Sequence, residues 1–397
     1  MGNGQRRVVS TTDLGRWNAE VVLDRLYNRE QSSNAELARH TGLSRSTVER
    51  ALDLLADQGL VTKSDPVALV SGRPAALYRL RPDAGHLLAV DVGANTIRAR
   101  VDDLAGPLSG GPVADAADHE PAAATVRPED PADRRLAAMD ALVDRALAAA
   151  GITEDQVRAV TVATPGIVDA EGTVIACLVI KSGDWVGDHL RTRVGERFLG
   201  AAVTVDNDAH LAVLGEQRFG VAGDAGELVA VFAGRRVGFG ILHGGELHRG
   251  AHHQAGEAAN IRDSWWGRAS YWLHRHQDGA ERLFAAARAG QPEAVAETGE
   301  LADLLGMALA EVVHTIDPEL IVLGGALSLA GPTVLDPLND VFKRACRDTV
   351  TPPLLLSTLG RRAVLLGAAE HARRTAFSHL LDGARPHLPN TSPRSGR

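Results

Sequence analysis

Cysteine and aromatic residues are scarce in this chain, and it has no long apolar run. Its 397 residues include two cysteines, and Phe, Trp and Tyr together make up 4%. The cysteines, Cys177 and Cys346, are too few for a disulfide framework or a cysteine-rich zinc site. No apolar run reaches the roughly 18 residues that a membrane span needs, and the first residues lack the apolar core of a signal peptide. The sequence therefore predicts a cytoplasmic protein without membrane contact.

The composition is that of a globular protein with two or three domains. The chain is 45% hydrophobic and 23% charged, and its 41 glycines favour α/β domains with many tight turns. The charge is uneven. Residues 1–82 contain 12 Lys and Arg against 9 Asp and Glu, whereas the whole chain has a net charge of −8. A mildly basic segment on an acidic chain predicts contact with a polyanion through residues 1–82 only.

Three short helices are predicted near the start of the chain. Their expected ranges are 17–28, 35–40 and 45–58. Ser33 or Asn34 can cap the second helix and Ser44 the third. Apolar residues recur on one face of the third helix at positions i, i+4 and i+7, which predicts a buried stripe of Val48, Leu52 and Leu55.

Two extended segments follow these helices, at residues 60–62 and 77–80. Between them lies a polar loop that ends in Ser71-Gly-Arg-Pro74. Three helices followed by a two-stranded hairpin are typical of a winged helix–turn–helix domain. We predict this domain over residues 1–82.

The start of the third predicted helix contains the expected DNA-contacting residues. In a helix–turn–helix domain the second helix of the motif lies in the major groove, with its N-terminal residues at base edges. Hydroxyl and backbone N–H groups suit phosphates, and an arginine can bind guanine O6 and N7 together. Arg73 is expected to enter an A·T-rich minor groove. The predicted DNA-binding residues are Ser44, Arg45, Ser46, Thr47, Arg50 and Arg73.

Two observations weaken this interpretation. Glu49 at the same helix start would repel phosphate unless it accepts a hydrogen bond from a cytosine amine. A net charge of +3 in residues 1–82 is also small, because DNA affinity depends largely on phosphate neutralisation. A three-helix bundle that binds another protein is the alternative. Double-stranded DNA remains the predicted partner, and a homodimer or higher homo-oligomer would multiply the contacts.

Beyond Arg81-Pro-Asp83 the pattern changes to alternating strands and helices, which predicts two α/β lobes. Residues 105–131 are rich in Ala, Pro, Gly and Asp and are expected to form a loop or an edge segment. The expected strands are 87–92, 157–163, 203–206, 228–233, 240–242 and 320–323, and the expected helices 134–150, 209–219 and 301–315.

Five short motifs follow one another in this part of the chain. They are Asp91–Thr96, Ala163–Asp169, Asp206–Ala209, Gly250–Glu257 and Asp317–Ser328. Each motif alone is weak, but their order and spacing resemble the ROK family (repressors, open reading frames and sugar kinases). Together with the N-terminal domain, the chain resembles the ROK repressors over about residues 15–380.

The resemblance implies a multidomain protein whose α/β body is actin-like and hexokinase-like (ribonuclease H-like), with two lobes around a sugar cleft. Asn207 and Asp208 match the family's sugar-binding pair, and Glu257 matches the glutamate of its Ala-Gly-Glu motif. Acceptor carboxylates and an amide also suit the hydroxyls of a polyol. The domains implied are residues 1–82, lobe 1 at 83–205, lobe 2 with a C-terminal helix at 206–384, and a disordered tail at 385–397.

The phosphate loops depart from the family pattern. Where the family has Gly-Thr-Gly, this chain has Gly234-Arg-Arg-Val-Gly238, and the family's Gly-Gly-Thr is here Gly93-Ala-Asn95. The arginines put bulk where backbone must approach phosphate, although arginine can itself bind phosphate. Since phosphoryl transfer depends on positioning and charge stabilisation, we predict binding without catalysis and without a nucleotide cofactor. If the chain were a kinase, Asp208 would be its base.

The family's zinc site is also absent from the sequence, so we predict no metal. Ala258-Ala-Asn260 replaces the usual Ile-Gly-His, and no cysteine lies between residues 178 and 345. A group of aromatic residues occupies the position of the zinc loop. We interpret this group as a hydrophobic plug, that is, as apolar packing that takes the place of the zinc ion in stabilising the loop. The alternative is a platform on which a carbohydrate ring stacks. Its members are Trp265, Trp266, Tyr271 and Trp272.

Three functions are compatible with these observations. The favoured one is a sequence-specific DNA-binding transcriptional regulator, most simply a repressor, whose body binds a small effector such as a carbohydrate. The second is an active sugar kinase with an additional N-terminal domain. The third is an effector-independent DNA-binding or scaffolding protein.

Overall fold

The computed structural model describes residues 11–27, 31–65, 75–107, 122–234, 236–276, 280–329, 331–347 and 349–382. The chain divides into two compact units. The unit that we call the head contains the described residues up to Gly85, residues 103–106, and those from Arg373 onward. The unit that we call the body contains residues 86–102 and 107–372. The domain boundaries expected from sequence, at residues 82, 205 and 384, stay predictions.

The head contains a helix–turn–helix and a small antiparallel sheet of strand order β1-β3-β2. The predicted stripe of Val48, Leu52 and Leu55 is fully buried. Ser33 caps α2 in a capping box with Glu36, because each side chain accepts a hydrogen bond from the other's backbone N–H. The loop before β3, including Arg73, lies outside the described residues. The elements are α1 (Thr11–Tyr27), β1 (Ser32–Ser33), α2 (Asn34–Thr41), α3 (Arg45–Asp57), β2 (Val61–Lys63) and β3 (Leu77–Leu80).

The last helix, α11 (Ala363–Asp382), contributes its final residues to the head. Arg373 donates a hydrogen bond to Asp24 Oδ1 at 2.8 Å, and its guanidinium lies 4.6 Å from the ring centre of Tyr27. The Arg373 side chain is only 3% exposed and that of Asp24 is 47% exposed, so this ion pair is partly shielded from solvent. The contact ties α1 to the C-terminal end of the described chain.

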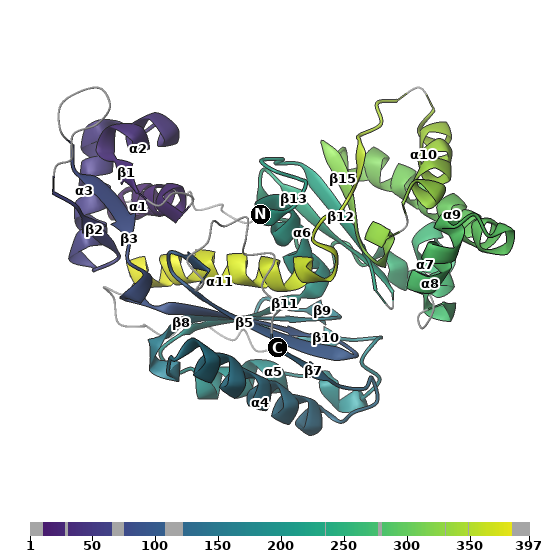
Figure 1. The fold of residues 1–397 in the computed structure, drawn as a ribbon, viewed down its shortest axis with the longest axis horizontal. Coiled ribbons are helices and arrows are strands. Elements are labelled where there is room, and N and C mark those ends of the chain that lie inside the picture. Colours follow the sequence, from purple (N-terminus) through teal and green to yellow (C-terminus); the bar gives the residue numbers. More distant parts are fainter. Residues whose placement is uncertain are drawn as a thin grey trace, which may run out of the picture. The chain divides into compact units, whose positions relative to one another are not determined.

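The first sheet of the body has the strand order β11-β8-β4-β5-β6, and β7 pairs with β5. The strands β11, β8 and β4 are parallel and mostly buried, which explains their nearly continuous apolar sequences. Helices α4 and α5 cover one face of this sheet (Figure 1). The elements are β4 (His86–Val92), β5 (Thr96–Asp103), β6 (Gly106–Pro107), β7 (Ala122–Thr125), α4 (Ala132–Ala150), β8 (Val157–Thr164), α5 (His189–Arg197) and β11 (Ala202–Asn207).

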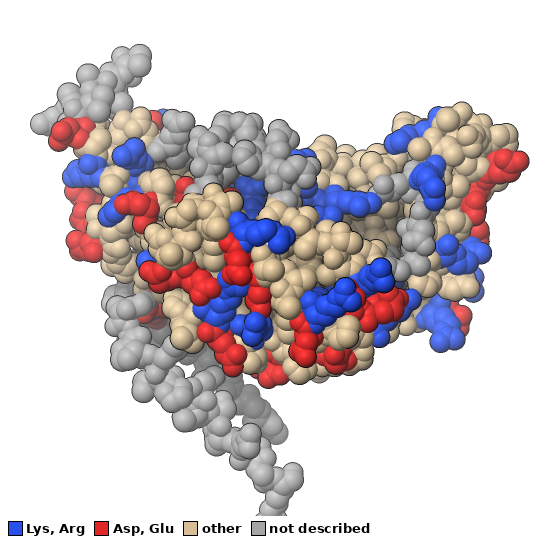
Figure 2. All heavy atoms as spheres, turned by 60° about the horizontal axis from the view of Figure 1, so that its bottom comes forward, with Lys and Arg blue, Asp and Glu red and all other residues tan. Residues whose placement is uncertain are grey.

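The outer surface of α4 and α5 mixes charges of both signs. Figure 2 turns this side of the body toward the viewer and shows basic and acidic side chains next to one another. Arg193 and Arg197 of α5 both pair with Asp140 of α4. The basic side chains seen there are therefore partly neutralised by neighbouring carboxylates, and this surface is not a single-sign patch of the kind that binds a polyanion.

The second sheet of the body has the order β14-β13-β12-β15-β16. Its strands are β12 (Leu228–Ala233), β13 (Val237–His243), β14 (Glu246–Leu247), β15 (Leu320–Gly325) and β16 (Leu354–Leu356). The two sheets and their helices confirm the expected α/β lobes. The remaining elements are the hairpin β9 (Ile167–Val168) and β10 (Val174–Ala176), and the helices α6 (Asp208–Phe219), α7 (Trp265–Arg275), α8 (Ala280–Arg288), α9 (Pro292–Ile316) and α10 (Pro332–Cys346).

The aromatic group expected as a plug lies on and next to helix α7. Trp266 and Trp272 are fully buried in the largest apolar cluster of the body, as the plug interpretation predicts. Tyr271 is 65% exposed, so it is not part of that plug. Within the described residues, no helix has the length and apolar character needed to cross a membrane.

Candidate functional site

The N-terminal part of α3 and its cap carry five of the six predicted DNA-binding residues. Ser44 caps the helix by accepting a hydrogen bond from the backbone N–H of Thr47 at 3.1 Å. The side chains of Arg45, Ser46 and Arg50 are exposed. Arg50 Nε donates to the carbonyl of Ser46 at 3.3 Å, which lays the guanidinium along the same turn of the helix. The positive end of the helix dipole, two arginines and three hydroxyls thus lie together at one accessible end.

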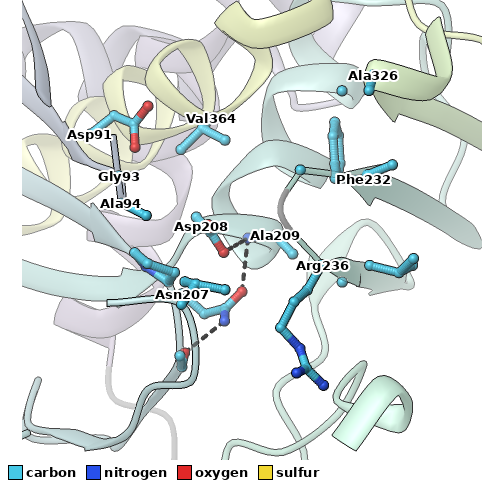
Figure 3. Close-up of a pocket in the computed structure, with 18 of the residues that line it drawn as sticks. Asp91, Gly93, Ala94, Asn207, Asp208, Ala209, Phe232, Arg236, Ala326 and Val364 are labelled. Carbon is cyan, nitrogen blue, oxygen red and sulfur yellow. Dashed lines mark hydrogen bonds between the residues drawn. The ribbon is translucent and has the colours of Figure 1, made fainter. Parts of the chain in front are cut away.

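The body contains a cavity of about 510 Å³, which is lined by residues of both sheets. Figure 3 shows that Asp91, Asn207, Asp208 and Arg236 are among its lining residues. The cavity lies where β4 and β11 end and α6 begins, the carboxyl-terminal edge at which α/β sheets commonly bind ligands. All three predicted effector residues line it: Asn207, Asp208 and Glu257.

Asn207 is held in place by four hydrogen bonds. Its Oδ1 caps α6 by accepting from the backbone N–H groups of Ala209 at 2.8 Å and His210 at 3.1 Å. Its Nδ2 donates to the carbonyl of Gly166 at 2.7 Å and to Glu257 Oε1 at 3.2 Å. These bonds fix the amide and bring two of the predicted residues, 50 positions apart in the chain, into direct contact.

Glu257 is positioned by a tight loop and a second amide. The preceding Gly256 has φ +89°, and a Cβ there would lie 1.9 Å from the carbonyl oxygen of Phe239, so only glycine allows this approach. Asn260 Nδ2 donates to Glu257 Oε2 at 2.8 Å. Asn260 replaces the histidine usual in the resembled family, and the structure shows that this replacement still orients the glutamate. Sequence reasoning missed this role because the contact depends on the loop conformation.

The cavity brings carboxyl groups close together. Burial, followed by the negative charges of Asp91 and Glu257, raises the pKa of Asp208 to about 7. Burial raises the pKa of Asp91 to about 6, although the guanidinium of Arg98, 3.2 Å away, opposes the shift. Burial also raises the pKa of Glu257. With pKa values near neutrality, Asp208 and Asp91 can donate a hydrogen bond when protonated and accept one when ionised.

Arg236 extends from the turn between β12 and β13 and lines the same cavity. Its Nη2 donates to the carbonyl of Ala259 at 3.1 Å. The neighbouring Arg235 lies outside the described residues. From sequence, these arginines were expected to add bulk to a phosphate loop. The structure shows that Arg236 instead reaches the backbone of the segment that follows Glu257.

A network of charged and polar side chains supports the cavity from behind. Arg249 contacts Asp206 Oδ2 through Nε at 2.9 Å and Nη2 at 2.5 Å. His210 lies between Asp206 Oδ1 at 3.2 Å and the carbonyl of Ala255 at 3.1 Å. Burial alone would raise the pKa of Asp206, but these two partners outweigh it and hold the pKa below its usual range. This network links the end of β11 to the loop that carries Glu257.

The cavity lining includes none of the histidines at positions 252, 253, 274 and 276. His276 contacts the carboxylate of Glu297 and the carbonyl of Trp272. His252 and His274 are exposed. Across the part of the chain that the structure describes, no group of three or more His, Cys, Asp or Glu side chains has an arrangement that could hold a metal ion.

Comparison with protein families gives a match over most of the chain. The model of the ROK family matches residues 88–262 and 266–375. The chain belongs to the ROK family. A second model, of the IclR helix-turn-helix domain, matches residues 20–65, which include α2 and α3. The chain is therefore a ROK protein with an N-terminal IclR-type helix–turn–helix domain.

Known ROK proteins differ in how much of the chain they match. The xylose repressor of Caldicellulosiruptor bescii is 23% identical over 393 residues, covering 90% of this chain and 95% of the repressor. The glucokinase of Streptomyces coelicolor is 31% identical over 231 residues, covering 48% of this chain and 73% of the kinase. A crystal structure of a ROK transcriptional regulator, a homolog of the E. coli MLC protein, has the same fold, with 20% identity, a TM-score of 0.68, and coverage of 93% of this chain and 98% of that one.

These matches distinguish two types of ROK protein. The repressors are similar over nearly the full length of this chain, and the glucokinase is similar over only about half of it. The helix–turn–helix domain implies DNA binding. The protein is accordingly a ROK transcriptional regulator related to the xylose repressors.

Proposed function

We propose that this ROK protein is a transcriptional repressor whose cavity binds a small carbohydrate effector, and that this binding changes its affinity for operator DNA. The observation that carries the proposal is the presence of two separate sites on one chain. One is an exposed, arginine-bearing start of α3, and the other is a cavity in which Asn207, Asp208 and Glu257 converge.

The DNA-binding half rests on the geometry of α3. In the proposal Ser44 and Thr47 contact phosphates, while Arg45 or Arg50 contacts base edges in the major groove, with Ser46 beside them. A homodimer places two heads on a two-fold symmetric operator, so that the contacts double. Arg73 is proposed to reach a minor groove from the wing.

The effector half rests on the polar groups of the cavity. Fixed amides and carboxyl groups facing one space suit a molecule whose hydroxyls point in several directions. A ligand shifts the balance between two states of the protein only by its difference in affinity for them. The effector must therefore contact residues whose arrangement differs between the DNA-binding and the released state.

The proposal is tested by selecting duplexes from a random pool with the full-length protein and then measuring binding by fluorescence anisotropy. D-xylose, D-glucose and N-acetylmannosamine are added in turn to the selected complex. We expect specific binding that one of these sugars weakens. Asp208→Asn should keep operator affinity and lose the response to the sugar. If no duplex is enriched, the repressor function is wrong.

A second candidate function is a sugar kinase, favoured by the similarity to glucokinases and by Asp208 at the position of the family's base. We infer that the cavity does not turn over ATP, because Arg98 pairs with Asp91 and Arg236 stands in a phosphate loop. Incubation with Mg-ATP and the same sugars, followed by measurement of ADP, decides between the two. Sustained ADP formation that depends on both a sugar and Asp208 would establish the kinase.

A further inference from the structure

Helix α3 carries more acidic than basic side chains. All of its charged side chains are exposed: Arg45 and Arg50 are basic, and Glu49, Asp53 and Asp57 are acidic. DNA is a polyanion, and affinity for its phosphates comes from basic side chains. Attraction to phosphates therefore does not explain the charge of this helix, although α3 is the helix that the proposed function places in the major groove.

Glu49 lies beside both arginines at the start of the helix. It follows Arg45 by four residues, one turn further along the same side of α3, and it directly precedes Arg50. Within the described part of the chain, the carboxylate of Glu49 makes no hydrogen bond or ion pair, either with these arginines or with another group. Arg50 instead donates from Nε to the carbonyl of Ser46. The Glu49 carboxylate is thus available to a ligand of the helix.

The first turn of α3 is fixed by hydrogen bonds to its cap and to α2. The hydroxyl of Ser44 lies 3.0 Å from that of Ser46 and 2.8 Å from that of Thr47, so three short side chains are joined around the cap. Asn34 of α2 donates from Nδ2 to the carbonyl of Arg45 at 3.2 Å. The longer charged side chains on this turn and the next therefore extend from a backbone that is held in place.

A carboxylate in the major groove has few favourable partners. It repels the phosphates along both edges of the groove, and it accepts hydrogen bonds only from base amines. Cytosine presents an N4 amine without an adjacent acceptor, whereas adenine places the N7 acceptor next to its N6 amine, where it repels a carboxylate. Guanine offers two acceptors that suit an arginine. A carboxylate beside arginines is therefore suited to a cytosine close to a guanine.

We propose that Glu49 is a specificity-determining residue of the head, which accepts a hydrogen bond from the N4 amine of a cytosine while Arg45 or Arg50 binds a nearby guanine. The inference rests on the DNA-binding half of the proposed function, and it adds one base of the operator and the side chain that selects it. Because Glu49 brings a negative charge to the DNA, it improves discrimination between sequences and lowers the affinity for DNA of any sequence.

The test is selection of duplexes from a random pool, with the full-length unaltered protein and with Glu49→Gln, followed by sequencing. The unaltered protein should enrich duplexes that have a cytosine at one position of each half-site. Glu49→Gln should replace that cytosine with adenine, because a glutamine amide donates to N7 and accepts from N6 of adenine. The other positions of the enriched sequence should stay the same.

Fluorescence anisotropy with the enriched duplex and its single-base variants measures the size of the effect. In Glu49→Ala, the preference for cytosine at that position should fall from about 10-fold to near one. The affinity for a scrambled duplex should rise, because one negative charge has been removed. Asp57→Asn is the matched control, since it removes the same charge from the exposed last residue of α3. The control should leave the enriched sequence unchanged.

Two results would overturn the inference and leave the proposed function standing. One is enrichment by the unaltered protein of a sequence without a cytosine that depends on Glu49. The other is an equal rise in affinity of Glu49→Gln and Glu49→Ala for every duplex, because Glu49 then acts only by repelling phosphates. If the unaltered protein enriches no duplex at all, the inference and the DNA-binding half of the proposed function fail together.

Discussion

Arginines of the head and arginines of the body are placed in different electrostatic surroundings. On α3, Arg45 and Arg50 are exposed at a helix N-terminus. In the body, Arg98 and Arg249 contact the buried carboxylates of Asp91 and Asp206. Exposed cations suit an extended polyanion, and the affinity that they give depends on salt concentration. Cations inside the body are screened less by salt and act only on groups close to them. This difference is what we expect if, as proposed, the head binds DNA and the body binds a small molecule.

The largest expected effect concerns the network behind the cavity. Arg249→Gln leaves the carboxylate of Asp206, 3% exposed, without its strongest cation, and should destabilise the body by about 3–5 kcal/mol. The pKa of Asp206 is lowered in the folded protein, so its contribution to stability is present at neutral pH. That contribution is lost as the pH falls below about 4.

Thermal unfolding of Arg249→Gln, followed by circular dichroism between pH 3 and neutral pH, measures this effect. The variant should lose part of the acid sensitivity of the unaltered protein. Arg193→Gln, which removes a half-exposed ion pair with Asp140, is the control and should change stability by less than about 1 kcal/mol. Equal losses in the two variants would show that the Asp206 network is no stronger than a surface pair.

The second expected effect is a substitution in the head that leaves the body unchanged. Leu52→Ala removes a fully buried side chain of α3 and should destabilise the head by about 2–5 kcal/mol. Operator binding should weaken strongly, while sugar binding in the cavity stays unchanged. Leu14→Ala, at a 50% exposed position of α1, is the matched control and should have little effect. Calorimetry with a sugar measures the affinity of the cavity, and anisotropy with labelled DNA measures the affinity for the operator, on the same protein sample.

The third effect tests the assignment of Arg50. Arg50→Ala should weaken operator binding by about 1–3 kcal/mol and relax the preference at one base pair, because a bidentate contact to guanine is lost. Arg25→Ala, which removes an exposed arginine of α1, should leave that preference intact. An equal loss of affinity for the operator and a scrambled duplex would assign Arg50 to a phosphate contact instead.

The head could be predicted from sequence in detail because its determinants are local. Ser33 and Ser44 cap helices that begin at the next residue, and the apolar period of α3 marks its buried face. Helix α10 was not predicted, and it contains Pro337, a residue that argues against a helix in any local analysis. The long helix α9 begins nine residues earlier than expected, at Pro292.

The candidate site was predicted only in part. Asn207, Asp208 and Glu257 follow from their motifs, and the structure places all three at one cavity. The partners of these residues were not predictable, because the contact of Asn260 with Glu257 and that of Arg236 with Ala259 depend on how distant loops fold together. The motifs were enough to find three residues that line the cavity, whereas long-range contacts decide how these residues are charged and held.

The smallest expected effect is a gain in stability, whereas the substitutions above reduce stability or DNA affinity. The pKa of Asp208 is raised to about 7 in the folded protein, so ionisation of this group costs stability, and the cost grows as the pH rises from about 4 to 7. Asp208→Asn should therefore stabilise the protein by on the order of 1 kcal/mol at pH 8, and by less at pH 5. Thermal unfolding at the two pH values measures this. The exposed control Asp224→Asn should show no such difference.

The central claim is that one chain reads DNA with its head and senses a sugar in its body. The most direct test is an anisotropy titration of a labelled duplex from the region upstream of the protein's own gene, in the presence of random competitor DNA, with and without each of the sugars. The account predicts specific binding that one of these ligands weakens in the unaltered protein and not in Asp208→Asn. Equal affinity for the duplex and the competitor, or specific binding that no ligand changes, would contradict it.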